Sequence, residues 1–158
     1  MQPLLPDVEI IPIRTEEERR AAIAESQILL TATQRGDKPL IYLDMLHPGL
    51  LGIPLESTAW EGRAYTHADR FVCDDWNLVQ TYLADGKYTD GLNDEYELLG
   101  DIINGDAVGR ADESEFVITS SHGVALSDVA VGAMILERAE AQGVGEILTL
   151  MEEGDIIR

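Results

Sequence analysis

The stretch ITSSHGVALSDVAVGAMILERAEAQGVG, residues 118–145, predicts a strand, a sharp turn and one long helix. The turn carries Ser120, Ser121, His122 and Gly123, so polar groups gather at the entrance of an otherwise apolar helix. Two explanations remain open. Either these groups cap the helix, or the helix entrance faces a ligand, because a helix N-terminus favours an anion or a carbonyl group.

The composition limits the classes of protein to which the chain can belong. It has 158 residues, 45% of them hydrophobic, which predicts a single compact domain over residues 1–158. No apolar run reaches the roughly 18 residues that a membrane span needs, and the amino terminus lacks a leader pattern. We therefore expect a cytoplasmic protein with no membrane partner. The single cysteine, Cys73, allows no internal disulfide, and we expect no metal site.

Acidic residues dominate the charge. The chain has 30 Asp and Glu residues against 11 Lys and Arg residues, a net charge of −19. Such a field repels nucleic acid, which is therefore not an expected partner. The acidic residues are dispersed between apolar positions, so they do not form a disordered tail. A surface of this kind suits a protein from a halophilic source, because concentrated salt screens its self-repulsion.

Strand-like and helix-like segments alternate along the chain. The predicted strands are 8–14, 27–33, 50–54, 70–75 and 115–121, and the predicted helices are 15–25, 76–86, 94–105 and 123–143. The first of these helices begins with a capping box formed by Thr15 and Glu18. Residues 57–68 are the least regular and predict a surface loop. Because the strands are continuously apolar, the pattern predicts an α/β fold with a mostly parallel sheet flanked by helices.

Polar or small residues follow three of the predicted strands. They are Thr31, Ala32 and Thr33, then Asp74 and Asp75, and finally Ser120, Ser121 and His122. In open α/β sheets, ligands bind beyond the carboxyl ends of the strands, so these residues are candidates for a binding site. Taken one at a time, they are equally explained as strand ends and helix caps. The chain has no G-x-G-x-x-G, G-x-x-x-x-G-K-[ST], G-x-S-x-G or H-E-x-x-H motif.

Four further residues have structural explanations. His47 lies in a Leu-His-Pro-Gly turn and is expected to be structural, and His67 is expected to be solvated. We expect Cys73 to be a small buried residue and Trp76 to be a packing residue.

The succession of segments resembles the ornithine cyclodeaminase and mu-crystallin family. The segments that carry the resemblance are AESQILLTAT (24–33), LHPG (46–49), ADRFVCDD (68–75), ELLGDIINGDAVGR (97–110), SSHGVALSDVAV (120–131) and ERAEAQGVG (137–145). The resemblance implies a partial Rossmann-like domain that binds NAD or NADP, joined in the family to a substrate and dimerisation domain. It also implies cyclodeamination of ornithine, reduction of cyclic imines or keto acids, or amino-acid dehydrogenation.

The resemblance also implies roles for individual residues. The cofactor-binding candidates are Thr31, Ala32, Thr33, Ser121, His122 and Gly123. Among them, Thr31, Thr33, Ser121 and Gly123 match positions that line the nicotinamide side in the family. The catalytic candidates are Glu56, near the position of a family aspartate that acts on the substrate, and Asp74.

The chain is about half the length of such an enzyme and lacks the family's glycine-rich loop and its substrate-binding lysine and arginine. Three hypotheses remain. The chain is a subunit of a split or degenerate oxidoreductase or cyclodeaminase, a non-catalytic module that self-associates or binds a partner, or an independently active enzyme. Because strands of the family's sheet are missing, we expect either that 8–14 pairs with 27–33 or that another polypeptide completes the sheet. The expected partners are therefore a second copy or a complementary polypeptide, with a small amino acid or cyclic imine as substrate.

Overall fold

The computed structural model describes residues 8–33, 38–56 and 58–148. It divides into two compact units, Met1–His122 and Gly123–Arg158. The first unit holds the sheet, and the second holds the helix α5 (Ala125–Gln142). Gly123 and Gly143 border this helix with φ angles of 80° and 63°, a left-handed conformation that glycine adopts without strain. That the chain forms a single domain stays a prediction.

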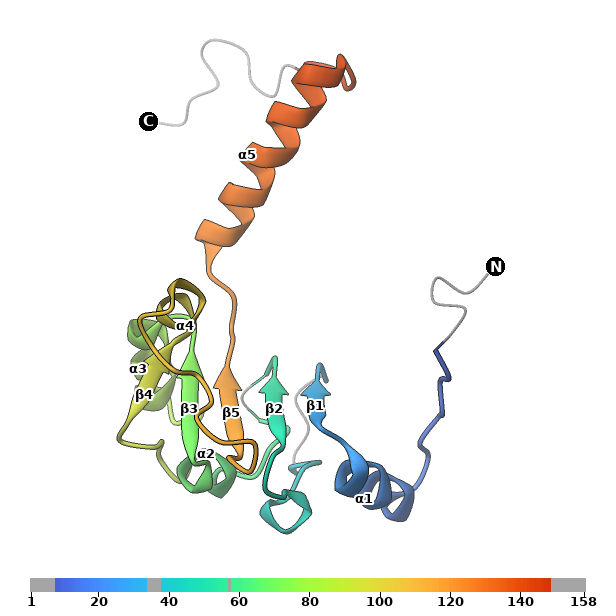
Figure 1. Cartoon of the computed structure of the whole chain (residues 1–158), viewed down its shortest axis with the longest axis vertical. Helices are drawn as coiled ribbons and strands as arrows, with labels where there is room; N and C mark the ends of the chain where they lie inside the picture. Colours follow the sequence, from blue (N-terminus) through green and yellow to red (C-terminus); the bar gives the residue numbers. More distant parts are fainter. Residues whose placement is uncertain (1–7, 34–37, 57, 149–158) are drawn as a thin grey trace. The chain divides into compact units, whose positions relative to one another are not determined.

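The first unit is an α/β fold built on a parallel sheet. In chain order its elements are α1 (Glu16–Glu25), β1 (Ile28–Thr31), the 3-10 helix η1 (Leu43–Met45), β2 (Leu51–Pro54), α2 (Arg63–His67), β3 (Arg70–Cys73), α3 (Trp76–Ala84), β4 (Tyr96–Leu98), α4 (Leu99–Asn104) and β5 (Val117–Ser120). The strand order is β1-β2-β5-β3-β4, and every pairing between these strands is parallel. The carboxyl ends of the strands therefore meet at one edge, as their arrowheads show in Figure 1.

The burial of each strand follows its place in the sheet. In β3, next to the central strand β5, Phe71, Val72 and Cys73 are all buried, which confirms the expectation for Cys73. In β1 only Thr31 is buried, because β1 lies at the edge. Strands whose residues are continuously apolar are expected in the middle of a sheet that is covered on both faces.

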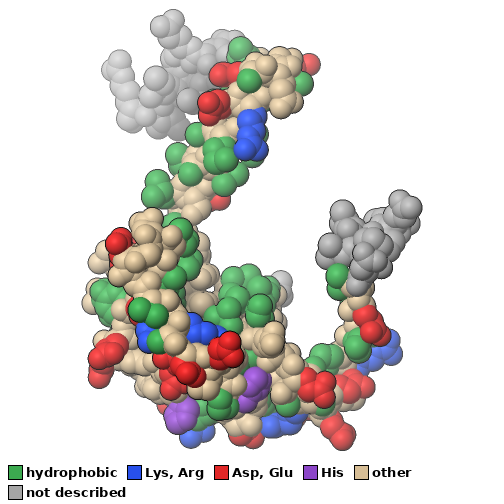
Figure 2. Space-filling model, in the orientation of Figure 1, with side chains coloured by type: hydrophobic (Ala, Val, Ile, Leu, Met, Phe, Trp, Pro, Cys, Tyr) green, Lys and Arg blue, Asp and Glu red, His purple; other side chains and the backbone are tan. Residues whose placement is uncertain are grey.

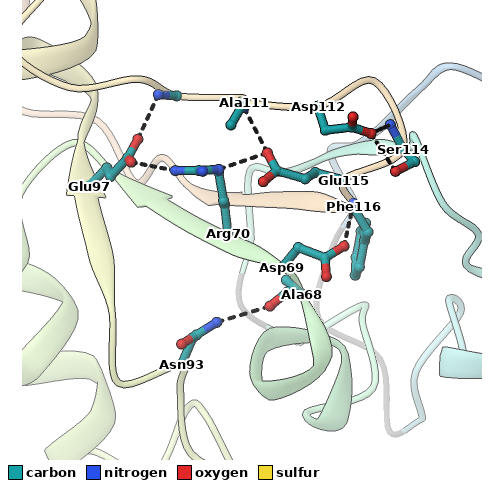
Figure 3. A network of polar contacts seen from close by, with 11 residues as sticks. Ala68, Asp69, Arg70, Asn93, Glu97, Ala111, Asp112, Ser114, Glu115 and Phe116 are labelled. Carbon is teal, nitrogen blue, oxygen red and sulfur yellow. Dashed lines mark hydrogen bonds and ion pairs between the residues drawn. The ribbon is translucent and has the colours of Figure 1, made fainter.

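An ion-pair network fixes the amino-terminal ends of the central strands (Figure 3). Arg70 of β3 lies between two carboxylates: its Nη1 donates to Glu97 of β4 at 2.6 Å, and its Nε donates to Glu115 at 2.7 Å. Glu115 also accepts a hydrogen bond from the backbone N–H of Ala111. These contacts lower the pKa of Glu115 to about 2, with the hydrogen bond from Arg70 as the largest cause.

The predicted strand 8–14 is wrong: the segment has no regular secondary structure, and β1 pairs with β2 alone among the described residues. Ile10 and Ile11 are 85% and 71% exposed. Pro12 explains part of the difference, because proline has no N–H to donate to a strand ladder. Of the two alternatives for completing the sheet, the pairing of this segment with 27–33 is therefore wrong.

Two further expectations are corrected. Residues 94–105, predicted as one helix, form β4 followed by α4, because pairing with β3 outweighs the helical pattern of Tyr96–Leu98. The prediction of a surface loop at 57–68 is wrong for 58–68, the part of this segment that the structure describes, because Trp60 and Tyr65 are 2% and 1% exposed and belong to the core.

Other predictions are confirmed. The capping box of Thr15 and Glu18 is present at the start of α1. His47 joins two segments through hydrogen bonds with the carbonyl oxygens of Ile23 and Pro48, and Trp76 stacks on Tyr96 with ring centroids 3.9 Å apart. None of the described helices is both long and apolar enough to cross a bilayer.

Candidate functional site

The candidate site lies at the carboxyl ends of four neighbouring strands, β1, β2, β5 and β3. The strand order places the groups that follow them along one edge of the sheet. Adjacent strands are about 4.8 Å apart, so β1 and β5, with β2 between them, are separated by about 10 Å. Residues that are far apart in sequence therefore come within the reach of one small ligand. Four of the predicted site residues, Thr31, Thr33, Glu56 and His122, belong to two hydrogen-bonded groups along this edge.

The first group, which we call the Glu56 group, joins β1 to the end of β2. The hydroxyl of Thr31 donates to Oε1 of Glu56 at 2.7 Å, and the backbone N–H of Thr33 donates to Oε2 at 3.2 Å. Nε1 of Trp60 donates to the hydroxyl oxygen of Thr31 at 2.8 Å. Both carboxylate oxygens are therefore occupied, and the side chain of Glu56 fixes the end of β1.

The second group, which we call the His122 group, lies at the end of β5. The hydroxyl oxygens of Tyr88 and Ser120 are 2.6 Å apart, and the Tyr88 hydroxyl is 2.8 Å from Nε2 of His122. Ser120 and Tyr88 are buried, whereas His122 is half-buried. A row of three hydrogen-bonded side chains therefore leads from the core towards the surface at the carboxyl end of β5.

Aromatic and charged neighbours complete the surroundings of His122. The ring of Tyr82, in α3, meets the imidazole edge to face at 4.4 Å, and Nζ of Lys87 lies 3.3 Å from the centre of the Tyr82 ring. Burial lowers the pKa of His122; Lys87 lowers it further, and Asp74 opposes the shift. Burial also raises the pKa of Tyr88 to about 12. At neutral pH the imidazole is therefore neutral and the phenol keeps its proton.

The two aspartates after β3 differ in their roles. Asp75 caps α3, because its Oδ1 accepts hydrogen bonds from the backbone N–H groups of Asn77 and Leu78. Asp74 accepts a hydrogen bond from the N–H of Asp75 and acts electrostatically on His122. Among the described residues, no three His, Cys, Asp or Glu side chains are grouped so that they could hold a metal ion.

The structure brings together most of the predicted site residues of the first unit. Thr31, Thr33 and Glu56 form one group, and His122 and Asp74 act on each other in the second. Ala32 is exposed and Ser121 is half-buried beside His122, whereas Gly123 begins the second unit.

Sequence analysis missed two residues of the site, Trp60 and Tyr88. Trp60 lies in a segment that we expected to be a surface loop, and Tyr88 lies between a helix and a strand that no sequence signal connects to the site. The indole N–H of Trp60 and the hydroxyl of Tyr88 reach the site only because the long connections that carry them fold back onto the sheet.

Cavities of about 470 and 590 Å³ lie elsewhere, near the amino-terminal ends of the strands. Arg70 lines one and His47 the other, and both residues make the structural contacts described above.

The comparisons with known proteins agree with this architecture. The model of the ornithine cyclodeaminase/mu-crystallin family matches residues 6–143. The N-((2S)-2-amino-2-carboxyethyl)-L-glutamate dehydrogenase of Staphylococcus aureus is 26% identical over 142 residues, which cover 85% of this chain and 41% of the dehydrogenase. A Delta(1)-pyrroline-2-carboxylate reductase of Bacillus cereus is 29% identical over 98 residues, covering 62% of this chain and 30% of the reductase.

A solved structure is similar in fold. An archaeal alanine dehydrogenase dimer with bound NAD superposes with a TM-score of 0.66 and 24% identity, covering 88% of this chain and 44% of that one. The chain thus spans less than half the length of each of these proteins. Because the family model covers most of the chain, the chain belongs to the ornithine cyclodeaminase/mu-crystallin family.

Proposed function

We propose that the chain is the nicotinamide-facing part of an NAD(P)-dependent oxidoreductase that acts on a small amino acid or a cyclic imine. The names of its relatives, a dehydrogenase and a pyrroline-carboxylate reductase, favour redox chemistry over cyclodeamination. A nicotinamide cofactor supplies or accepts the hydride in such a reaction. The residues of this chain orient the nicotinamide and the reacting group.

The observation that carries the proposal is the convergence of the Glu56 group and the His122 group at one sheet edge. A nicotinamide ring is flat and carries a carboxamide, so it fits between small hydroxyl side chains and neutral hydrogen-bond donors. Thr31 and Ser121 are small, and His122 is neutral. The carboxylates of Glu56 and Asp74 are the candidate acids or bases, and Asp74 acts electrostatically on His122.

The chain alone does not supply every part of a dinucleotide site. It has no G-x-G-x-x-G loop, so another segment must bind the pyrophosphate. The open edge of β1 is where such a segment would extend the sheet, because β1 has only one partner strand among the described residues. Figure 2 shows hydrophobic side chains at the surface over the carboxyl ends of β1 and β2, where Leu30 and Leu55 are 55% and 47% exposed.

We therefore propose a complementary polypeptide segment as the partner at the β1 edge. It would carry the glycine-rich loop and the substrate-binding basic residues. The chain spans 41% of the length of the Staphylococcus aureus dehydrogenase, which leaves room in that enzyme for such a segment.

The test is a calorimetric titration with NAD(H) and NADP(H) in molar salt. The purified chain is titrated alone and after mixing with the amino-terminal portion of the Staphylococcus aureus dehydrogenase, and its mass in solution is recorded. Saturable binding in either arm supports the proposal. If circular dichroism shows a folded protein and neither arm binds, the chain is not part of a nicotinamide site.

A second candidate function rests on α5. Within its own unit this helix buries none of its residues, although it carries Leu126, Val129 and Ile135. Small residues at Ala130, Gly132 and Ala133 would let another helix approach closely. A non-catalytic module that self-associates through α5 predicts a dimer in solution, which Ile135→Glu abolishes, and no affinity for either nucleotide.

A further inference from the structure

The His122 group has a property that the proposed function does not use. The Tyr88 hydroxyl is in contact with two polar groups at once, the Ser120 hydroxyl at 2.6 Å and Nε2 of His122 at 2.8 Å. A phenol has one proton to donate. Which of the two groups receives that proton decides the hydrogen-bonding state of the whole group.

A neutral imidazole allows Nε2 to accept the Tyr88 proton. His122 is neutral at neutral pH and Tyr88 keeps its proton, so one ring nitrogen is an acceptor and the other a donor. Ser120 can donate its hydroxyl proton to the Tyr88 oxygen, which leaves the Tyr88 proton for Nε2. His122 then carries its own proton on Nδ1, a nitrogen that has no hydrogen-bond partner among the described residues.

Building on the proposed function, we propose that His122 is a ligand-binding residue that donates a hydrogen bond from Nδ1 to a carbonyl-type oxygen, and that Tyr88, anchored by Ser120, is the positioning residue that sets this tautomer. The oxygen belongs either to the carboxamide of the nicotinamide or to the carboxylate of the substrate. Both present the same acceptor. A neutral imidazole that polarises a carbonyl in this way also avoids placing a second full positive charge beside Lys87.

The groups around His122 are consistent with a neutral ring. Tyr82 covers it from α3, Tyr88 holds Nε2, and Lys87 opposes protonation from the connection after α3. Among the described residues, Asp74, at the end of β3, is the carboxylate that favours protonation. Burial is the largest influence and favours the neutral form.

The first test is an NMR measurement of the histidine tautomer in the ligand-free chain. Long-range ¹H–¹⁵N spectra distinguish a proton on Nδ1 from a proton on Nε2. We expect His122 to carry its proton on Nδ1, and Tyr88→Phe to shift the population towards Nε2. Tyr82→Phe is the matched control, because it removes a hydroxyl that makes no hydrogen bond to His122 and keeps the ring that packs on it. A wild-type ring protonated on Nε2, or an unchanged tautomer in Tyr88→Phe, overturns the role of Tyr88.

The second test titrates the chain with two probes while following the His122 signals. Nicotinamide mononucleotide presents the carboxamide, and pyrrole-2-carboxylate presents a planar carboxylate. We expect one probe to shift the Nδ1 signal saturably. His122→Ala should weaken that probe about tenfold, the usual size of one lost hydrogen bond. His122→Asn should recover part of the affinity, because its amide nitrogen lies close to the position of Nδ1.

The outcomes separate this inference from the proposed function. If NAD(H) binds in the calorimetric titration but His122→Ala binds as tightly as the natural chain, the inference is wrong and the proposed function stands. If neither probe binds and NAD(H) fails in both calorimetric arms, both are wrong.

Discussion

The absence of a side chain at Gly52 makes room for Trp60, which belongs to the Glu56 group. A Cβ atom at this position would lie 2.7 Å from the Trp60 ring and 3.4 Å from the side chain of Ile118. Trp60 therefore packs over β2 with its indole N–H reaching the Thr31 hydroxyl. The geometry of a predicted site residue depends here on a glycine that carries no chemistry of its own.

Replacing Gly52 with alanine should destabilise the first unit. The added methyl group forces Trp60 to move, an overpacking that costs about 1–3 kcal/mol, less the roughly 0.4–1 kcal/mol gained from a stiffer unfolded chain. We expect the free energy of unfolding in urea to fall by about 1–2 kcal/mol. The intrinsic fluorescence of the folded variant should also change if Trp60 is displaced.

Gly100 provides the matched control for this substitution. It lies in α4, and a Cβ atom there meets nothing within 4 Å. Gly100→Ala should leave stability unchanged or raise it by up to about 1 kcal/mol, because alanine favours a helix over glycine. Equal losses in the two variants would contradict the packing argument.

Glu115 gives the molecule an acid-dependent contact. Its pKa in the folded chain is lowered to about 2 from an ordinary value near 4.5, so its contribution to stability is full above pH 4.5 and is lost as the pH falls towards 2. Glu115→Gln should therefore be less stable than the natural chain at pH 7, and the two unfolding curves should converge between pH 4.5 and 2. Glu113→Gln, an exposed neighbour, should show no such convergence; a constant difference for Glu115→Gln would refute the assignment.

At the scale of elements, the sequence predicts those whose signals are local. The capping box of Thr15 and Glu18 sets the start of α1, and the glycine at 143 ends α5 one residue after Gln142. The parallel sheet follows from continuously apolar strands. By contrast, β4 exists because Tyr96–Leu98 pairs with β3, and segment 8–14 finds no partner strand in the described part of the chain despite its strand-like composition. Pairing is a long-range property that a local pattern does not contain.

The edge strand β1 should promote association in concentrated salt. Its Leu30 is 55% exposed, and β1 pairs on one side only within the described part of the chain. We expect Leu30→Lys to reduce the mass measured by sedimentation velocity at high protein concentration, or to weaken binding of a complementary segment. Its effect on the free energy of unfolding should stay within about 0.5 kcal/mol, since the side chain is exposed.

The control for this variant adds the same charge elsewhere. Gln80→Lys changes an exposed position on α3 by one positive charge and leaves the β1 edge unaltered. If both variants reduce association equally, net charge rather than the edge strand governs it.

At the scale of the whole molecule, the candidate site was only partly predictable. Strand-end positions and family resemblance identified Thr31, Glu56 and His122. The carboxyl ends of parallel strands meet at one edge of the sheet whatever the conformation of the connecting loops. Trp60 and Tyr88 enter the site from connections whose paths depend on the folded core. The sequence therefore predicts where the site lies better than it predicts which buried partners orient it.

The net charge of −19 makes the stability of the whole molecule dependent on salt. Screening shortens the range of charge repulsion from about 10 Å at 0.1 M salt to about 3 Å at 1 M. Relief of about 1–2 kcal/mol of repulsion should raise the thermal midpoint by roughly 3–8 °C between 0.1 and 2 M NaCl. Differential scanning calorimetry at pH 7 measures this rise. Near the sequence pI of 4.2 the net charge vanishes, so the same salt series should have a much smaller effect; an equal rise at both pH values would show that salt acts on hydrophobic burial and not on charge.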